Sequence, residues 1–521
     1  MHLYLITGLL LYLAEPPFGL WPLAFVALIP AMHAAHRART YRSAVLGGFL
    51  AGVAFFAPGL FWLTSTTFIG WAALALYCAT YIAIFAVLVR ATSNILALAA
   101  GWTILEFVRG AIAFTGFPWL LLSHSQYAFT PFTQILDVIG SYAMGGLLIA
   151  MNALIWKGAS SGRRKNLWIA AGILVGVCLY GYIRMYSITL RQAQRVALVQ
   201  ASVPQEMKEA LEGTYDPLGG LTKYLDASSA IPVDPKVDLL VWPETVVLSP
   251  YTLNVDPEIL KDALAADARF AQESLGRLAQ THKAYFLAGS TSFLPASHGY
   301  VSDAQVASRI PSGNWGRRYN SAYLLDPNGR YVDRYDKMHL VPFGEYIPLR
   351  GILPFLAKFV PFDASLSEGE KQTIFEIKRD GQTLKFGVLI CYEDTDSELA
   401  RRLRRDGADF FVNISNDAWF GLSELDQHYV TARFRAIENR VGVVRSGNNG
   451  LSGMIDPLGR SVILLDKNVI GNASGDLWIT DSRSLYTRVG DWPGVAASGI
   501  ILIFEFSRRK RTTDKRQHSK V

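Results

Sequence analysis

The sequence predicts an α-helical membrane domain of about eight spans joined to an exported α/β domain. Hydrophobic residues make up 51% of the 521 residues and charged residues only 18%, whereas about 25% of an ordinary soluble domain is charged. The apolar excess lies in residues 1–190 and in a short run near the C-terminus, and residues 191–490 have an ordinary α/β pattern. We therefore expect a membrane domain at 1–190, an α/β domain at 191–490, and a last span with a basic tail at 491–521.

Eight apolar segments are candidates for membrane spans. They cover 2–14, 20–35, 45–63, 70–90, 93–110, 132–156, 166–185 and 491–506. A bilayer core needs about 20 apolar residues, so the first two segments are short, and we expect a helical pair joined by a Pro- and Trp-rich interfacial turn. A signal peptide is the alternative for the first segment, but that segment lacks a basic start and a small-residue cleavage site.

The basic residues of the connecting segments predict the orientation. Lys and Arg gather in four places: 36–42, Arg90, 157–165 and 508–520. The intervening loops at 64–70 and 111–131 carry only Ser, Thr, Gly, Pro, Gln, His and apolar residues. Because Lys and Arg mark cytoplasmic loops, we expect both termini in the cytoplasm and 191–490 outside. In a bacterium this is the periplasmic side of the inner membrane. The net charge of +7 comes from these segments and does not indicate a nucleic-acid partner.

Residues 191–490 alternate β-rich runs with helical patterns. The runs lie at 195–203, 237–244, 284–293, 320–337, 384–393, 408–416 and 443–465, with a helix expected over 426–441. Many of these runs are apolar on both faces, which is expected when a sheet is covered on both sides. The pattern predicts an α/β domain with buried sheets.

Cys391 is the only cysteine of this domain, because Cys78 and Cys178 lie in expected spans. Exported proteins usually pair their cysteines or lack them. Cys391 ends an apolar run and is followed by Tyr392 and Glu393. A buried, inert cysteine is the alternative, but the polar and acidic neighbours favour a nucleophile.

A nucleophilic cysteine needs a base and a donor for the developing oxyanion. Glu244 follows an apolar strand in "VWPE", where partial burial can raise the pKa of a carboxyl group into the range of a general base. Lys337 follows a hairpin strand, and Glu345 comes eight residues later. His339 and His428 lack a second ligand at metal spacing, so we expect neither a metal nor a cofactor.

These motifs resemble a known superfamily. The order Glu, Lys, Cys in "WPE", "YDKMHLVPFGEYIP" and "ICYE" is similar to that of the carbon–nitrogen hydrolase (nitrilase) superfamily. Together with "NISNDAWFG", "NNG", "TGFPWL" and "PPFGLWPLAFVALIP", the chain resembles the apolipoprotein N-acyltransferase family over nearly its whole length. The resemblance implies an α-β-β-α sandwich for the exported domain.

The resemblance also implies a role for each matching residue. Glu244 would deprotonate Cys391 and later the incoming amine, and Cys391 would carry the acyl group as a thioester. Lys337 would stabilise the oxyanion, with the backbone N–H of Tyr392 as a second donor. Glu345 would keep Lys337 charged and oriented.

The implied reaction is a two-step acyl transfer by a membrane enzyme, which we expect to be a monomer. A fatty acyl chain would pass from a phospholipid such as phosphatidylethanolamine to the cysteine. It would then pass to the α-amino group of the N-terminal S-diacylglyceryl cysteine of an apolipoprotein. One alternative is a membrane-anchored amidase or nitrilase, which would give its acyl-enzyme to water. Another is a transporter or scaffold with a hydrolase-like binding module.

Four further features accompany this site. We expect Glu393 to be a structural partner in the pocket wall. The apolar run 352–362 is expected to form a lid or membrane-dipping loop, with a core helix as the alternative, and 297–318 is expected to be a polar loop. Glu106 and Arg109 are spaced to pair on a helix near the end of the fifth span, as a structural pair, an interfacial anchor or a head-group contact.

Overall fold

The computed structural model describes residues 1–204, 217–232, 236–247, 262–293, 317–347, 366–379, 381–420 and 422–518. It contains two compact units, a helical unit of Met1–Ile188 with Ser484–Val521 and an α/β unit of Thr189–Arg483. The run 352–362 and nearly all of the loop 297–318 lie outside the described residues.

The helical unit confirms the apolar helices expected from the sequence. Its α-helices are α1 (His2–Ala14), α2 (Ile29–His36), α3 (Tyr41–Gly59), α4 (Phe68–Ala91), α5 (Ile95–Phe107), α6 (Thr130–Thr133), α7 (Leu136–Ser161), α8 (Arg164–Ser187), α15 (Leu485–Val489) and α16 (Trp492–His518). Among the described residues, five segments are long and apolar enough to cross a membrane: α3, α4, Ile95–Thr115, α7 and α8.

The expected second span, 20–35, is not one continuous helix. A 3₁₀ turn at Trp21–Phe25 and the separate helix α2 replace it. Pro22 and Pro30 each lie in the first turn of one of these pieces. Proline lacks an N–H and disfavours a helical conformation of the residue before it, so each proline begins a new helical piece.

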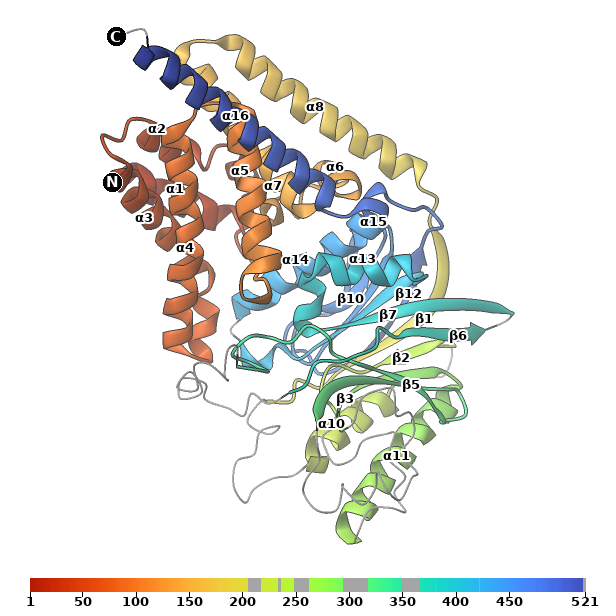
Figure 1. The fold of residues 1–521 in the computed structure, drawn as a ribbon. Helices are drawn as coiled ribbons and strands as arrows, with labels where there is room; N and C mark the ends of the chain where they lie inside the picture. Colours follow the sequence, from red (N-terminus) through yellow and green to blue (C-terminus); the bar gives the residue numbers. More distant parts are fainter. Residues whose placement is uncertain are drawn as a thin grey trace. The chain divides into compact units, whose positions relative to one another are not determined.

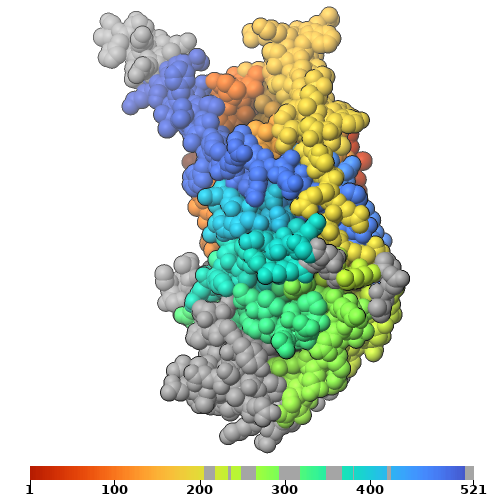
Figure 2. All heavy atoms as spheres, turned by 90° about the vertical axis from the view of Figure 1, so that its right-hand side faces the viewer, coloured from red at the N-terminus to blue at the C-terminus, as the bar shows by residue number. Residues whose placement is uncertain are grey.

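Two helices of this unit expose apolar side chains, α8 over most of its length and α16 between Trp492 and Phe506. On α8, Trp168 is 76% and Tyr186 is 89% exposed, and on α16 Ile503 and Phe504 are each 70% exposed. Figure 2 shows α8 (gold to yellow) and α16 (blue) on the visible face of the unit. Exposed apolar side chains of this kind are expected where lipid covers the protein. The helical unit therefore has the surface of a membrane domain.

The expected neighbours Glu106 and Arg109 bind the backbone that follows α5. Arg109 donates to the carbonyl oxygens of Phe117 (3.0 Å) and Trp119 (2.7 Å), and Glu106 accepts from the N–H of Leu122 (2.7 Å). Both side chains are buried. They hold the 117–122 segment, which fits a structural role.

The α/β unit contains two six-stranded sheets (Figure 1). Sheet one has the order β12-β1-β2-β3-β4-β5, with β1 (Arg191–Gln200), β2 (Leu239–Val241), β3 (Tyr285–Phe293), β4 (Arg318–Leu325), β5 (Tyr331–Asp336) and β12 (Gly471–Ile479). Sheet two has the order β11-β10-β9-β8-β7-β6, with β6 (Ile374–Arg379), β7 (Gln382–Ile390), β8 (Phe410–Ser415), β9 (Gly442–Gly447), β10 (Ser452–Ile455) and β11 (Ser461–Leu465). The central strands β1–β2–β3 and β7–β8–β9 are parallel.

The two sheets pack face to face, and helices cover their outer faces. Val241 of sheet one and Val388 of sheet two belong to one buried cluster between the sheets. Leu240 points to the other side of sheet one, into the cluster with α10 (Pro217–Ser229) and α11 (Asp262–His282). Helices α13 (Ser397–Arg405) and α14 (Leu422–Asn439) cover sheet two in the same way (Figure 1). This confirms the expected α-β-β-α sandwich and explains why the strands are apolar on both faces.

Candidate active site

Three strand ends carry the residues that the sequence singled out. Glu244 follows β2, Lys337 directly follows β5, and Cys391 directly follows β7. Strands β2 and β5 belong to sheet one and β7 to sheet two. The structure brings Glu244 and Lys337 within ion-pair distance, and both interact electrostatically with the Cys391 thiol.

The loop that carries Glu244 is fixed against β3. The N–H groups of Val246 and Val247 donate to the carbonyl oxygen of Gly289 at 3.0 and 3.1 Å. A side chain at Gly289 would place its Cβ 2.6 Å from the Cα atom of Glu244. Glycine is therefore required for this close approach, and Thr245 adopts a positive φ of 55° in the same turn. The backbone of Glu244 has little freedom to move.

Two carboxylates and an amide surround the Lys337 ammonium. Lys337 Nζ lies 2.9 Å from Glu345 Oε2 and 3.8 Å from Glu244 Oε1. The Asn320 amide lies between the carboxylates and donates to Glu244 Oε1 (2.6 Å) and Glu345 Oε1 (3.1 Å). The backbone N–H of Asn416 donates to Glu244 Oε2 (2.8 Å). The orientation of both carboxylates is thus set by neutral donors as well as by the lysine.

Burial and charge set the protonation of the three central groups. Burial raises the pKa of Glu244, and the nearby Lys337 ammonium offsets part of that rise. Burial alone would lower the pKa of Lys337, but the carboxylates of Glu345 and Glu244 outweigh it and raise that pKa. Burial, reinforced by Glu244, raises the pKa of the Cys391 thiol. The lysine is therefore charged and the thiol protonated at neutral pH, so the thiol needs a base to react.

Cys391 occupies a strained backbone position at the start of a 3₁₀ turn, Cys391–Thr395. Its φ is 51°, in the left-handed region. Such a conformation costs about 1–3 kcal/mol and persists only where the surroundings hold it. The Cys391 carbonyl oxygen is held by Asn413 Nδ2 and by His428 Nε2, each at 3.3 Å.

Glu393 connects the segment after β5 to the segment after β7. One of its oxygens accepts from the Tyr335 hydroxyl (2.7 Å) and from the N–H groups of Met338 (2.7 Å) and His339 (3.0 Å). Its other oxygen accepts from the N–H of Ile390 at 2.8 Å. Glu393 thereby joins the residues on either side of Lys337 to the strand that ends at Cys391.

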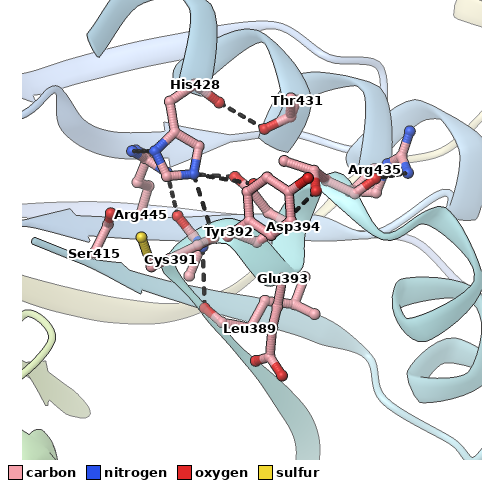
Figure 3. A network of polar contacts seen from close by, with 12 residues as sticks. Leu389, Cys391, Tyr392, Glu393, Asp394, Ser415, His428, Thr431, Arg435 and Arg445 are labelled. Carbon is pink, nitrogen blue, oxygen red and sulfur yellow. Dashed lines mark hydrogen bonds and ion pairs between the residues drawn. The ribbon is translucent and has the colours of Figure 1, made fainter. Parts of the chain in front are cut away.

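A buried ion network of His428 with Asp394, Asp417, Glu424 and Arg445 was not anticipated from the sequence. Figure 3 shows His428, Asp394 and Arg445 of this network beside Cys391. His428 Nε2 is 3.1 Å from Asp394, and Nδ1 is 3.1 Å from Asp417 and 3.2 Å from Glu424. Arg445 contacts Asp417 at 2.9 Å and Asp394 at 3.3 Å. All five side chains are at most 2% exposed.

Three members of this network, Asp417, Glu424 and His428, offer metal-ligand atoms within 4.8 Å of one another. Arg445 NH2 already lies 3.1 Å from His428 Nδ1, on the same side as Asp417. Its guanidinium supplies the positive charge that these carboxylates require. The chemistry of the donors therefore fits an ion-pair network better than a metal centre.

Comparisons with known proteins agree with this architecture. A family model described as carbon-nitrogen hydrolase matches residues 195–477, and one described as apolipoprotein N-acyltransferase N-terminal domain matches residues 7–154. Among solved structures, Nit3 of Saccharomyces cerevisiae, a nitrilase-superfamily member, is 23% identical with a TM-score of 0.37, over 55% of this chain and 91% of that chain. The family model that spans residues 195–477 assigns the α/β unit to the carbon–nitrogen hydrolases.

Full-length relatives define the family more narrowly. The apolipoprotein N-acyltransferase of Geobacter metallireducens is 31% identical over 97% of this chain and 95% of its own length. That of Methylococcus capsulatus is 30% identical over 99% of this chain and 98% of its own length. The chain belongs to the apolipoprotein N-acyltransferase family, as the resemblance of its motifs implied.

Proposed function

We propose that this protein moves a fatty acyl chain from a membrane phospholipid to the N-terminal S-diacylglyceryl cysteine of apolipoproteins. Membership of the family supports this function. The mechanism is supported by the 3.8 Å distance between Lys337 Nζ and Glu244 Oε1 and by the electrostatic effect of both groups on the Cys391 thiol. The same chain also contains five segments apolar enough to cross a membrane, among the described residues. A site that receives lipid substrates needs such an attachment, since a long acyl chain is costly to transfer into water.

In the first step, Glu244 takes the proton of the Cys391 thiol. The thiolate attacks the ester carbonyl of the phospholipid, and the ammonium of Lys337 stabilises the oxyanion, with the N–H of Tyr392 as a second donor. The tetrahedral intermediate then expels the lysophospholipid alkoxide, which takes the proton from Glu244. The products are a Cys391 thioester and a lysophospholipid.

In the second step, the α-amino group of the diacylglyceryl cysteine attacks the thioester. Glu244 accepts a proton from the attacking amine, and the same donors stabilise the second oxyanion. Collapse forms the amide and releases the Cys391 thiolate, which recovers a proton from Glu244. The transfer is ping-pong, because lysophospholipid leaves before the acceptor reacts.

Glu345 and Glu244 have different roles around Lys337. Glu345 is the nearer partner of the ammonium, at 2.9 Å compared with 3.8 Å for Glu244. Glu345 keeps the lysine charged, so Glu244 is left to exchange protons with the thiol and the amine. The buried Asn320 amide donates a hydrogen bond to each of the two carboxylates, which reduces the repulsion between them.

The experiment supplies the purified protein with phosphatidylethanolamine and a synthetic diacylglyceryl lipopeptide. We expect an acyl thioester on Cys391 before the acceptor is added, and an N-acylated peptide after it, both detected by mass spectrometry. A Cys391→Ala variant should form neither product. Free fatty acid without N-acylated peptide, or ammonia released from a small amide, would instead support the amidase alternative.

The same proposal includes an orientation, with both termini in the cytoplasm and the α/β unit in the periplasm. The basic segments at 36–42, 157–165 and 508–520 support it through the excess of Lys and Arg expected in cytoplasmic loops. Protease added to intact spheroplasts should cleave the α/β unit and spare a tag at either terminus. Cleavage of both tags with an intact α/β unit would reverse the orientation.

A further inference from the structure

We propose that His428 is a positioning residue for the acyl transfer at Cys391. Together with Asn413, it holds the Cys391 carbonyl oxygen and thereby sets the direction of the neighbouring Tyr392 N–H, the second oxyanion donor. This inference rests on the proposed function and assigns a task to the buried ion network, which the catalytic steps above do not use.

The backbone at Cys391 needs external support. Its φ of 51° is unfavourable for a residue with a Cβ, and positions of this kind are kept only where surrounding contacts over-determine them. The residue begins the Cys391–Thr395 turn immediately after β7. A small rotation here would move both the thiol and the following peptide.

Two side chains supply that support at one atom. The Cys391 carbonyl oxygen accepts from Asn413 Nδ2 and from His428 Nε2, each at 3.3 Å. Asn413 Nδ2 also donates to the Leu389 carbonyl oxygen at 3.0 Å. A trans peptide is planar, so the N–H of Tyr392 points in the opposite direction to the Cys391 carbonyl. Fixing the carbonyl fixes the donor.

The contacts of His428 indicate that its Nε2 atom carries a proton. Nε2 lies 3.1 Å from the Asp394 carboxylate and 3.3 Å from the Cys391 carbonyl oxygen, and both partners are acceptors. Nε2 must therefore be protonated, and its hydrogen is shared between them. Figure 3 shows the ring between Arg445 and Asp394, with Cys391 beside it.

The opposite ring edge anchors the histidine rather than the cysteine. Nδ1 lies 3.1 Å from Asp417 and 3.2 Å from Glu424. These carboxylates, with Arg445, fix the ring plane, and His428 itself is 1% exposed. Anchoring and positioning thus reside on different nitrogens, which makes them separable by substitution.

The test compares His428→Gln with His428→Asn. The glutamine amide reaches the region of Nε2 and can still donate to the Cys391 carbonyl, whereas the shorter asparagine amide reaches only the region of Nδ1. With phosphatidylethanolamine vesicles, thioester formation in His428→Gln should stay within about tenfold of the parent. In His428→Asn it should fall about 100-fold or more, as for a misplaced oxyanion donor. His282→Asn, a change at a buried histidine of α11, should leave the rate unchanged.

A second variant covers the case in which the His428 variants do not fold. Asn413→Asp keeps the shape of the side chain but replaces the donor to the Cys391 carbonyl, and we expect thioester formation to slow at least about tenfold. A parental rate in Asn413→Asp, or equal rates in His428→Gln and His428→Asn, would overturn the inference.

Alkylation of Cys391 by iodoacetamide separates this inference from the proposed function, because it needs no lipid. We expect the rates to rank parent, His428→Gln, then His428→Asn, since the thiol moves with the same peptide. If the parent forms no thioester while this ranking holds, the acyl-transfer proposal fails and the positioning role stands. If the parent forms the thioester and the ranking is absent in both assays, the positioning role fails alone.

Discussion

Lys337 and Glu345 form a buried ion pair in which Nζ lies 2.9 Å from Oε2, with side chains only 1% and 15% exposed. The N–H of Val341 also donates to Glu345 Oε2 at 2.8 Å, which fixes the carboxylate independently of the lysine. The pair therefore has a defined geometry before any substrate arrives. In the proposed mechanism, the Lys337 ammonium would stabilise the oxyanion without first having to reorient.

Glu345→Gln should reduce thioester formation less than Lys337→Met does. The glutamine keeps the shape of the side chain but removes the nearer negative charge, so Lys337 should pair with Glu244 and weaken the base. Loss of the donor in Lys337→Met should cost about 10²–10³-fold in rate. Single-turnover acylation with phosphatidylethanolamine measures both variants. A loss in Glu345→Gln as large as that in Lys337→Met would show that Glu345 does more than support the lysine.

The loss of acylation rate at acidic pH should reflect protonation of Glu244. Burial raises the pKa of this carboxyl group above the 4.5 of an ordinary glutamate. Because a base acts only when deprotonated, the rate should rise with pH through that pKa and be lost as pH falls through it. The acylation rate should therefore decrease in a pH range that lies above 4.5.

Glu244→Gln provides the matched control for this pH profile. It should lower the rate by about 10²–10⁴-fold and remove the decrease at acidic pH. The remaining rate should increase only at alkaline pH, as the Cys391 thiol, whose pKa burial raises, ionises without help. An unchanged decrease at acidic pH in Glu244→Gln would assign the titration to another group.

The sequence predicted that Glu244, Lys337 and Cys391 each follow an apolar run, and the structure places each of them just after a strand. It did not predict the ion network, because Asp394 and Arg445 are 51 positions apart and look like solvated charges when read singly. One local signal was present. Glu424 and His428 are four residues apart and share a face of α14, and that face is buried.

A similar limit applies to Asn320. It is a polar residue within the apolar strand β4, and only the pairing of β4 with β5 places it beside the segment that carries Lys337. In the helical unit, residue counts predicted the long spans, but hydropathy alone could not show that Pro22 and Pro30 divide the second segment. Positions determined by neighbours far along the chain are the ones that composition and periodicity miss.

Cys391→Gly should be more stable than Cys391→Ala. At a φ of 51° alanine keeps the unfavourable Cβ contact, which costs about 1–2 kcal/mol, and glycine removes it at some entropic cost in the unfolded chain. We expect a net difference of about 1 kcal/mol in the free energy of unfolding, measured by denaturant titration in detergent. Ala266→Gly, at an exposed position of α11, should have the opposite sign. Equal stability of the two Cys391 variants would mean that the position is unstrained.

Arg445→Met should destabilise the α/β unit far more than Arg195→Met. Arg445 lies 2.9 Å from Asp417, both side chains are 0% exposed, and its removal leaves buried carboxylates without their strongest partner. Breaking one side of such a pair costs about 3–5 kcal/mol. Arg195 lies 3.0 Å from Asp476 with side chains 30% and 35% exposed, and a pair of that kind contributes about 0–1 kcal/mol. Thermal unfolding should show a large decrease for the first variant and little change for the second. Equal decreases in thermal stability for the two variants would mean that water or protonation already neutralises the network. In that case, adding Asp417→Asn to Arg445→Met should restore no stability.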